Sequence, residues 1–345
     1  MIKPLACRIR CFRVARWIVF GLAAMGTALC IETAGTWAAS GSLRQPLAPL
    51  RTAGPLDAAK VTLGAALFSD PILSSMEKLS CVSCHDLTAG GTINERRTIG
   101  YQGRMHRFNA PTIFNVGNNY RLGWRGDFTS LEDQNEKVLL DENLMDATWP
   151  MLLERMRASQ TYSSAFQRIF GRPVERRDLL DVLATFQRSL ITPNSAFDKY
   201  LSGDHSALAP EELEGYRLFK EYGCASCHQG SNIGGNMFQK FGIFSAAPSA
   251  SPANDGDLGR FTLTGRDGDR GVFRVPSLRN VAVTAPYFHD GRASSLPEAV
   301  SIMARSQLGR TLTPDEIKSL VAFLDTLTGE YNGHKLEAAP STSHN

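Results

Sequence analysis

Two short segments of identical pattern constrain this chain more than any other feature. They are Cys81-Val82-Ser83-Cys84-His85 and Cys224-Ala225-Ser226-Cys227-His228, in which two residues separate the cysteines and a histidine follows directly. Two thiols at this spacing can reach both vinyl groups of one haem, and the next histidine then lies under the iron as an axial ligand. The pattern therefore predicts two covalently attached c-type haems, with His85 and His228 as proximal ligands.

Two other kinds of site use a CxxC pair. A zinc site does not require histidine directly after each pair, and a thioredoxin-like redox site has one pair beside a βαβ pattern, which this sequence lacks. Of the seven cysteines, Cys7, Cys11 and Cys30 lie in the first 39 residues, and the other four all belong to the two motifs. Four cysteines of an exported protein could form two disulfides, but the repeated histidine favours haem.

The first 39 residues differ in character from the rest of the chain. Five basic residues up to Arg16 precede an uncharged apolar run from Trp17 to Ile31, and small residues follow in Thr36-Trp37-Ala38-Ala39. This order is typical of a secretory signal peptide. The alternative is a membrane anchor, for which the apolar run is short. We predict that residues 1–39 are removed, that no stable membrane span remains, and that the protein is exported to the periplasm, where bacteria attach c-type haems.

Removal of this segment also changes the charge of the chain. The segment holds five bases and one acid, so its loss lowers the net charge from +3 to −1. The basic balance therefore belongs to the signal peptide, and no nucleic-acid partner is implied. A length of 345 residues, with 43% hydrophobic and 21% charged residues, suits a globular protein of two domains.

The surroundings of the two motifs repeat along the chain. A helix with a small residue on its contact face, Gly64 or Gly215, is predicted before each motif. Helices over 177–190 and 314–327 close the two halves, the second with Thr313 as its N-cap. We therefore predict a mainly α fold of two cytochrome c-like domains, each with one covalently bound haem, with long loops and little β structure. The expected divisions are an N-terminal domain at 40–198, a C-terminal domain at 199–331, a flexible loop at 246–256 and a disordered tail at 332–345.

The sixth iron ligand decides whether a haem transfers electrons or reacts. Met303 lies on a predicted helix far downstream of His228 and is a candidate ligand, although a buried methionine is more often core filler. No methionine has a comparable place near the first haem, so that haem is predicted to be open or weakly closed. One closed haem beside one open haem is the arrangement of an enzyme with its own electron-transfer module.

At this point the residues resemble a known family, the bacterial di-haem cytochrome c peroxidases, which include the MauG-type enzymes. The resemblance covers about 58–331 and is densest in the second half. Its longest matches are Phe219-Lys220-Glu221-Tyr222-Gly223-Cys224, Phe273-Arg274-Val275-Pro276-Ser277-Leu278-Arg279-Asn280-Val281 and Thr284-Ala285-Pro286-Tyr287-Phe288-His289-Asp290-Gly291. The resemblance implies that hydrogen peroxide reacts at the first haem and that a small cytochrome c or cupredoxin supplies electrons to the second.

The resemblance also implies roles for single residues. Met303 matches the axial ligand of the high-potential second haem, and Trp124 matches a tryptophan that helps electrons pass between the haems. Asn109 matches the side-chain ligand of a calcium ion between the domains, and Thr284 and Pro286 match its backbone carbonyl ligands. Family members often form homodimers, although this sequence shows no dimer face.

The chain departs from the family pattern near the first haem. Tyr101 stands where the peroxidases usually have a histidine that closes this haem, so Tyr101, nearby His106 or no residue at all remain as options for its sixth ligand. Gln134 matches a glutamine of the peroxide pocket. The glutamate expected ten residues later falls on Leu144, and Glu142 is the candidate to replace it as the acid and base for peroxide cleavage. A solvated loop acid is an equally good interpretation of Glu142.

The sequence thus predicts a periplasmic di-haem peroxidase that reduces hydrogen peroxide to water. Two alternatives remain open. One is a MauG-like oxidase that modifies a partner protein, which the altered pocket favours. The other is a pure electron carrier, which requires a sixth ligand on both irons.

Overall fold

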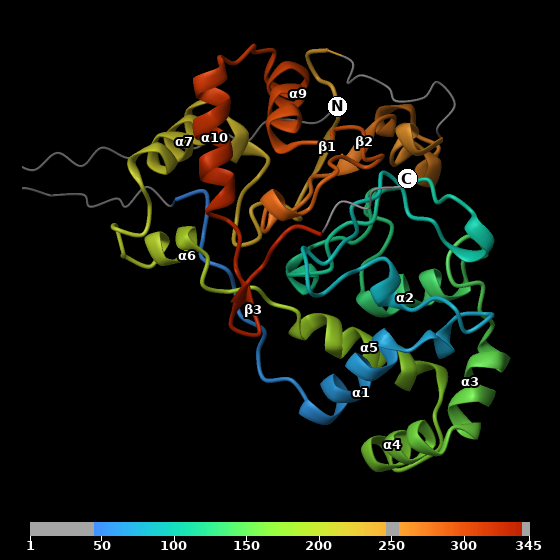
Figure 1. The fold of residues 1–345 in the computed structure, drawn as a ribbon. Helices are drawn as coiled ribbons and strands as arrows, with labels where there is room; N and C mark the ends of the chain where they lie inside the picture. The colour runs from blue at the N-terminus through green and yellow to red at the C-terminus, as the bar shows by residue number, and fades with distance from the viewer. Residues whose placement is uncertain (1–44, 246–254, 340–345) are drawn as a thin grey trace, which may run out of the picture. The chain divides into compact units, whose positions relative to one another are not determined.

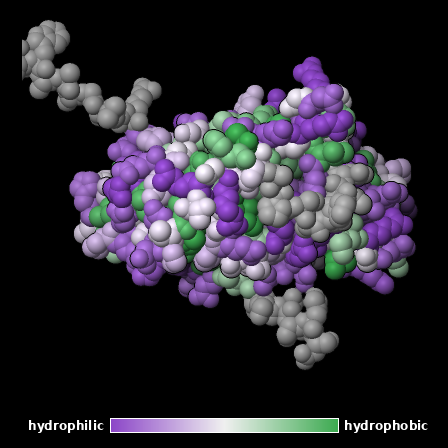
Figure 2. Space-filling model, turned by 90° about the horizontal axis from the view of Figure 1, so that it is seen from above, coloured by the Kyte–Doolittle hydropathy of each residue, from purple (hydrophilic) through white to green (hydrophobic). Residues whose placement is uncertain are grey.

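The computed structural model describes residues 45–245 and 255–339, so the predicted signal peptide and most of the predicted flexible loop lie outside the described residues. The described chain is mainly helical, with two short two-stranded sheets and long loops, as the sequence predicts (Figure 1). The face in Figure 2 is largely hydrophilic, with small separate hydrophobic areas. No helix among the described residues is long and apolar enough to cross a membrane.

The first half of the chain is built on a pair of packed helices, α1 (Ala58–Ser69) and α5 (Arg176–Ser189). A Cβ atom on Gly64 would lie 2.1 Å from the backbone oxygen of Val182, so the two helix backbones meet at this glycine, as predicted. Three more helices complete this half: α2 (Leu131–Leu140), α3 (Trp149–Ala158) and α4 (Gln160–Phe170).

The second half repeats this pairing with α7 (Pro210–Glu221) and α10 (Pro314–Asp325), which lie side by side in Figure 1. A Cβ on Gly215 would lie 1.9 Å from the backbone oxygen of Ser319. The predicted cap is present, because the Thr313 hydroxyl accepts the N–H of Glu316 while the Glu316 carboxylate accepts the N–H of Thr313. The other elements are α6 (Ala196–Leu201), α8 (Phe261–Thr264), α9 (Leu296–Leu308) and the antiparallel strands β1 (Phe238–Lys240) and β2 (Val272–Arg274).

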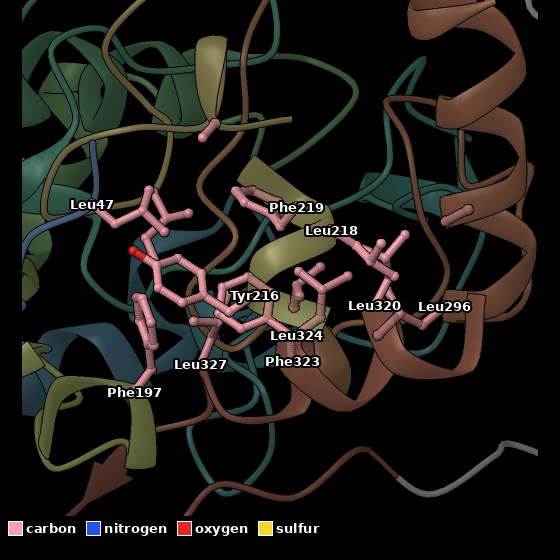
Figure 3. Close-up of a cluster of buried hydrophobic side chains, with 14 of the residues drawn as sticks. Leu47, Phe197, Tyr216, Leu218, Phe219, Leu296, Leu320, Phe323, Leu324 and Leu327 are labelled. Atoms are coloured by element: carbon pink, nitrogen blue, oxygen red, sulfur yellow. The ribbon is translucent and has the colours of Figure 1, made fainter. Parts of the chain in front are cut away.

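The core of the second half gathers aromatic side chains from α6, α7 and α10 (Figure 3). Phe197 of α6 is fully buried, and its ring meets that of Phe323 edge-on at 5.1 Å between centroids. The domain boundary predicted at 198/199 therefore falls within a helix whose first residues pack on the second half. A separate core in the first half joins α1, α3, α4 and α5.

The chain after residue 331 is ordered as far as residue 339, where the sequence predicts a disordered tail. Strands β3 (Glu330–Tyr331) and β4 (His334–Lys335) pair across a turn in which Asn332 and Gly333 have φ angles of 51° and 81°. An Asn-Gly pair favours this tight hairpin turn, because both residues tolerate positive φ. Leu336, only 5% exposed, then anchors the segment. Residues 340–345 lie outside the described residues.

The internal repeat extends further than the sequence analysis predicts. In each half an asparagine with left-handed backbone, Asn115 or Asn280, begins a short 3₁₀ helix, η4 (Val116–Asn118) or η8 (Val281–Val283). A serine then caps the next helix, Ser130 before α2 and Ser295 before α9. The same number of residues separates the members of every pair, which also include Asn109 and Arg274, Pro111 and Pro276, Trp124 and His289, and Gly126 and Gly291.

The two halves meet through this repeat with approximate twofold symmetry. The backbone N–H of Asn109 donates to the carbonyl of His289 at 2.8 Å, and the N–H of Arg274 donates to the carbonyl of Trp124 at 2.9 Å. Because both donors and both acceptors are repeat counterparts, the two hydrogen bonds are equivalent under exchange of the halves. The rings of Trp124 and His289 pack against each other at 6.4 Å between centroids.

Candidate haem sites

The second CxxCH motif opens into a cavity of about 290 Å³ with a predominantly apolar lining. Cys224 and Cys227, at the 3₁₀ helix η5 (Cys224–Ser226), line it together with His228. Met303, from the middle of α9, lines the same cavity. The fold thus brings together the four residues predicted to hold the second haem, although Met303 is far from the motif in sequence.

The electrostatics of this cavity fit a covalently bound haem. Burial raises the pKa of the Cys224 thiol to about 11 and lowers the pKa of His228 to about 4, although the carbonyls of Ile233 and Pro276 act in the opposite direction on the histidine. Uncharged sulfur suits a thioether bond, and neutral imidazole is the form that binds iron. A zinc site would need thiolates, which this apolar environment disfavours.

The first CxxCH motif has the same character. Its cysteines lie at the 3₁₀ helix η2 (Cys81–Ser83), and burial raises the pKa of Cys81 to about 12 and that of Cys84 to about 11. Burial also lowers the pKa of His85, whose Nδ1 lies 3.2 Å from the carbonyl oxygen of Gly91. A hydrogen bond at Nδ1 fixes the ring and leaves Nε2 for the iron.

A hairpin carries Tyr101 close to the loop that contains Glu142 and Leu144. The N–H of Tyr101 donates to the carbonyl of Leu144 at 3.0 Å, and the Arg104 guanidinium donates to the carbonyl of Glu142 at 3.0 Å. Tyr101 is half-buried, whereas the Glu142 side chain is exposed. The two departures from the family pattern, at Tyr101 and at Leu144, therefore lie next to each other in the fold.

His106 lies directly after the β-bridge that closes the same hairpin. Its Nδ1 accepts the backbone N–H of Phe108 at 3.3 Å, so Nε2 is the ring nitrogen that remains for another contact. Burial lowers the pKa of this half-buried ring, partly opposed by nearby Asp141. His106 is therefore a neutral imidazole near neutral pH.

Gln134 on α2 carries a buried side-chain oxygen, Oε1, that has no hydrogen-bond partner within residues 45–245 and 255–339. An unpaired buried amide oxygen is costly, so its position fits a polar ligand. The repeat adds a second observation on this helix. The counterpart of Met303 on α9 is Val138 on α2, which is half-buried and has no atom that could bind iron.

Trp124 lies at the junction of the halves and lines the second cavity. Its Nε1 donates to the carbonyl of Asn109 at 2.9 Å. Asn109, Thr284 and Pro286, predicted to hold calcium, line the same cavity. The Asn109 amide nitrogen donates to the carbonyl of Glu95 at 2.9 Å, which assigns the side-chain oxygen as the atom that could bind a cation.

Two residues at the junction, both within segments that match the family, were given no role at the haems in the sequence analysis. His289 is 3% exposed, lies with Nε2 2.7 Å from Asp257 Oδ1, and stacks on Phe273 at 4.3 Å between centroids. Arg274 is 5% exposed and lines the second cavity. Both could have been found from the repeat, since they are the counterparts of Trp124 and Asn109.

Comparison with known protein families divides the chain into the same two halves. Residues 58–206 match the di-haem cytochrome c peroxidase family and residues 213–328 match the cytochrome c family. The chain is 37% identical over 332 residues to a cytochrome c551 peroxidase of Nitrosomonas europaea, covering 96% of this chain and 97% of that protein. It is 31% identical to the methylamine utilization protein MauG of Methylorubrum extorquens, with 82% of each chain covered.

A solved structure shares the fold. The crystal structure of a MauG-like protein associated with microbial copper homeostasis matches with a TM-score of 0.72 and 29% identity, covering 84% of this chain and 95% of that one. The predicted fold class of two cytochrome c-type domains is confirmed. With these relatives and its two CxxCH motifs, the chain belongs to the family of di-haem cytochrome c peroxidases and MauG proteins, and it is an oxidoreductase of the peroxidase class with two c-type haems.

Proposed function

We propose that this enzyme reduces hydrogen peroxide to water at the first haem, with electrons that enter singly at the second. The observation that carries the proposal is a difference between equivalent positions of the repeat. Met303 lies on α9, and its counterpart on α2 is Val138. A thioether on one side and an aliphatic side chain on the other support one closed and one open iron. Cys81, Cys84 and His85 would then hold the haem that supplies the peroxide chemistry.

The bound haem supplies the redox chemistry, and the chain supplies orientation, access and protons. His85 is held by the Gly91 carbonyl, and the unpaired Oε1 of Gln134 can accept a hydrogen bond from the O–H of peroxide. Glu142, exposed on the neighbouring loop, is the proposed proton carrier between solvent and this pocket. Tyr101, on the hairpin beside that loop, is proposed to control access or to bind the iron weakly, with His106 as the alternative ligand.

Cys224, Cys227, His228 and Met303 would hold the second haem, which would supply electron entry, and Trp124 in the wall of the same cavity would connect it to the first half. The rim of this cavity supports a docking place for a small cytochrome c or cupredoxin. Ile243 lines the cavity and is 51% exposed, and its neighbour Phe244 is 66% exposed. An apolar rim beside a redox centre suits a transient partner.

Further features belong to the same proposal. A calcium ion at the junction would be held by the side-chain oxygen of Asn109 and the carbonyls of Thr284 and Pro286, a ligand set of the hard oxygens that calcium prefers. Cleavage of the signal peptide at 1–39 would deliver the domains 40–198 and 199–331 to the periplasm. Assembly as a homodimer is compatible with the family.

The decisive experiment is steady-state peroxide turnover with reduced cytochrome c after pre-reduction of the purified di-haem protein, in wild type and in Val138→Met. We expect wild-type turnover, and in Val138→Met a low-spin spectrum at the first haem with turnover at least tenfold lower, since the added thioether closes the open position. Val138→Leu is the matched control and should keep both activity and spectrum. Negligible wild-type turnover with both haems attached would overturn the peroxidase proposal.

A second candidate function is MauG-like oxidation of a partner protein. Leu144 at the expected glutamate position, together with the exposed Glu142, favours it, because weak proton delivery would slow peroxide cleavage. Failure of cytochrome c oxidation, combined with a peroxide-induced spectral change at the first haem, would support this candidate. Membership of the peroxidase family does not support the remaining alternative, a pure electron carrier.

A further inference from the structure

Arg274 is a buried cation at the wall of the second cavity. It ends strand β2, is 5% exposed, and lines the cavity together with Cys224, His228 and Met303. Its backbone N–H donates to the carbonyl of Trp124, and its Nε donates to the carbonyl of Gly123 at 3.0 Å. These contacts fix the guanidinium between the two halves of the chain.

One guanidinium nitrogen of Arg274 is left unsatisfied. The buried NH1 group has no hydrogen-bond partner, and no carboxylate forms an ion pair with this residue, within residues 45–245 and 255–339. Burial lowers the pKa of Arg274 to about 10, so the side chain stays cationic at neutral pH. An unpaired buried charge is strongly unfavourable, and such groups are normally paired.

Other buried arginines of this half show what is missing. Arg279 is 2% exposed and donates to Asp198 at 2.9 Å, and Arg292 pairs with Asp290 at 2.8 Å. The counterpart of Arg274 in the first half is the neutral Asn109, so the repeat itself does not require a cation here. We therefore expect Arg274 to have an anionic partner in the cavity that is not part of the polypeptide chain.

We propose that Arg274 binds a propionate carboxylate of the second haem and that this contact raises the reduction potential of that haem. The inference rests on the proposed function, because it takes the haem of Cys224 and Cys227 as the occupant of the cavity. Arginine is suited to this task, since its planar fork pairs with a carboxylate through two hydrogen bonds. A positive charge near the haem favours the reduced iron, which carries one positive charge less than the oxidised iron. Arg274 is thus a positioning residue for electron entry.

The test is a potentiometric titration of both haems, followed optically, in wild type, Arg274→Gln and Arg274→Lys. In Arg274→Gln the ratio of reduced to oxidised second haem at fixed ambient potential should fall on the order of tenfold, which corresponds to about 59 mV for a one-electron couple. Arg274→Lys keeps the charge and should retain most of the potential. Arg266→Gln removes the same charge from an exposed site of this half and should leave the potential unchanged, since exposed charges are screened.

Resonance Raman spectra of the second haem give an independent readout. The propionate bending band should shift in Arg274→Gln and return toward the wild-type position in Arg274→Lys, which a purely structural role would not produce. Arg274→Met is the second variant if the glutamine variant fails to fold, because its apolar side chain of similar length fills the same space without adding a buried polar group that needs a partner.

The outcomes separate this inference from the proposed function. Intact attachment of both haems with an unchanged second potential in Arg274→Gln and Arg274→Met would overturn the role of Arg274 alone. A shift confined to the first haem would also overturn it, because the propionate would then belong to the other site. Absence of haem on Cys224 and Cys227 in the wild-type protein would instead overturn the proposed function.

Discussion

At the scale of single residues, the two haem sites differ by a few side chains on equivalent elements. Met303 and Val138 occupy matching places on α9 and α2, and Arg274 and Asn109 occupy matching places two residues before Pro276 and Pro111. In the proposed function, these pairs distinguish a second haem with a thioether ligand and a nearby cation from a first haem with neither. On this proposal, side chains at equivalent backbone positions would make the two haems differ in their chemistry.

Leu144 is the residue at which a gain of function is predicted. Leu144→Glu places a carboxylate on the loop position whose carbonyl accepts the Tyr101 N–H, and general acid–base catalysis contributes about 10²- to 10⁴-fold. We expect kcat/KM for peroxide to rise by about 10²-fold, measured by oxidation of reduced cytochrome c. Glu142→Gln is the companion variant. If Glu142 already carries the proton, this substitution lowers turnover and Leu144→Glu restores it; an unchanged rate in Leu144→Glu contradicts the proposed pocket.

Met303 is the second residue with a defined expectation. Met303→Leu keeps the volume of the side chain but removes the sulfur, so the second haem should become high-spin when oxidised. Its potential should fall on the order of 0.1 V, within the range of about 0.8 V that axial ligands control. Optical spectra and redox titration measure both effects. Met156→Leu, at a fully buried methionine of the first core, is the control and should change neither.

At the scale of elements, the paired helices of each half depend on one glycine. A Cβ on Gly215 would lie 1.9 Å from the Ser319 oxygen, whereas a Cβ on Gly268 would meet nothing within 4 Å. Gly215→Ala should therefore push α7 away from α10 and lower the free energy of unfolding by about 1–3 kcal/mol. Gly268→Ala should change it by less than about 0.5 kcal/mol. Denaturant unfolding followed by circular dichroism measures the difference, and equal effects of the two substitutions would contradict the close helix contact.

The elements were predictable where a local physical signal exists. Four helices, α1, α5, α7 and α10, could be predicted from the helical spacing of apolar residues, the Thr313 cap and the two contact glycines. The spacing within the CxxCH motifs predicts the haem sites. Met303 needed the family resemblance, because a methionine on an apolar stripe has the same local pattern whether it packs or binds iron. The hairpin at 330–335 was missed although Tyr331-Asn332-Gly333-His334 contains a strong turn signal. Arg274 and His289 could not be recognised from local pattern alone, since their importance arises from contacts between the halves.

At the scale of the whole molecule, the junction of the halves is held by buried aromatic and polar groups around His289. The imidazole packs against Trp124 and Phe108 from the first half and against Phe273 and Phe241 from the second. Burial lowers the pKa of His289, although the hydrogen bond to Asp257 acts in the opposite direction. The unfolded chain therefore takes up a proton at this residue before the folded protein does.

This linkage predicts a pH dependence of stability. The contribution of His289 is fully present above the pKa of about 6.5 that histidine has in unfolded chains, and it is lost as the pH falls below that value. The free energy of unfolding should decrease by up to about 1.4 kcal/mol per pH unit there, and His289→Gln should flatten the slope. Denaturant titrations between pH 5 and 8 measure it. Exposed His334→Gln is the control, and an identical slope in His289→Gln would contradict the prediction.

The near-twofold junction also bears on how the two sites could come to differ. Reciprocal bonds such as Asn109 to His289 and Arg274 to Trp124 are the contacts of an isologous dimer, in which a patch binds its own copy. In a dimer of identical subunits every substitution appears on both sides, so a ligand gained at one iron is gained at the other. Fusion of two copies into one chain removes this constraint. Each position and its counterpart then vary independently, and a single covalent molecule acquires a division of labour that no symmetric pair could evolve.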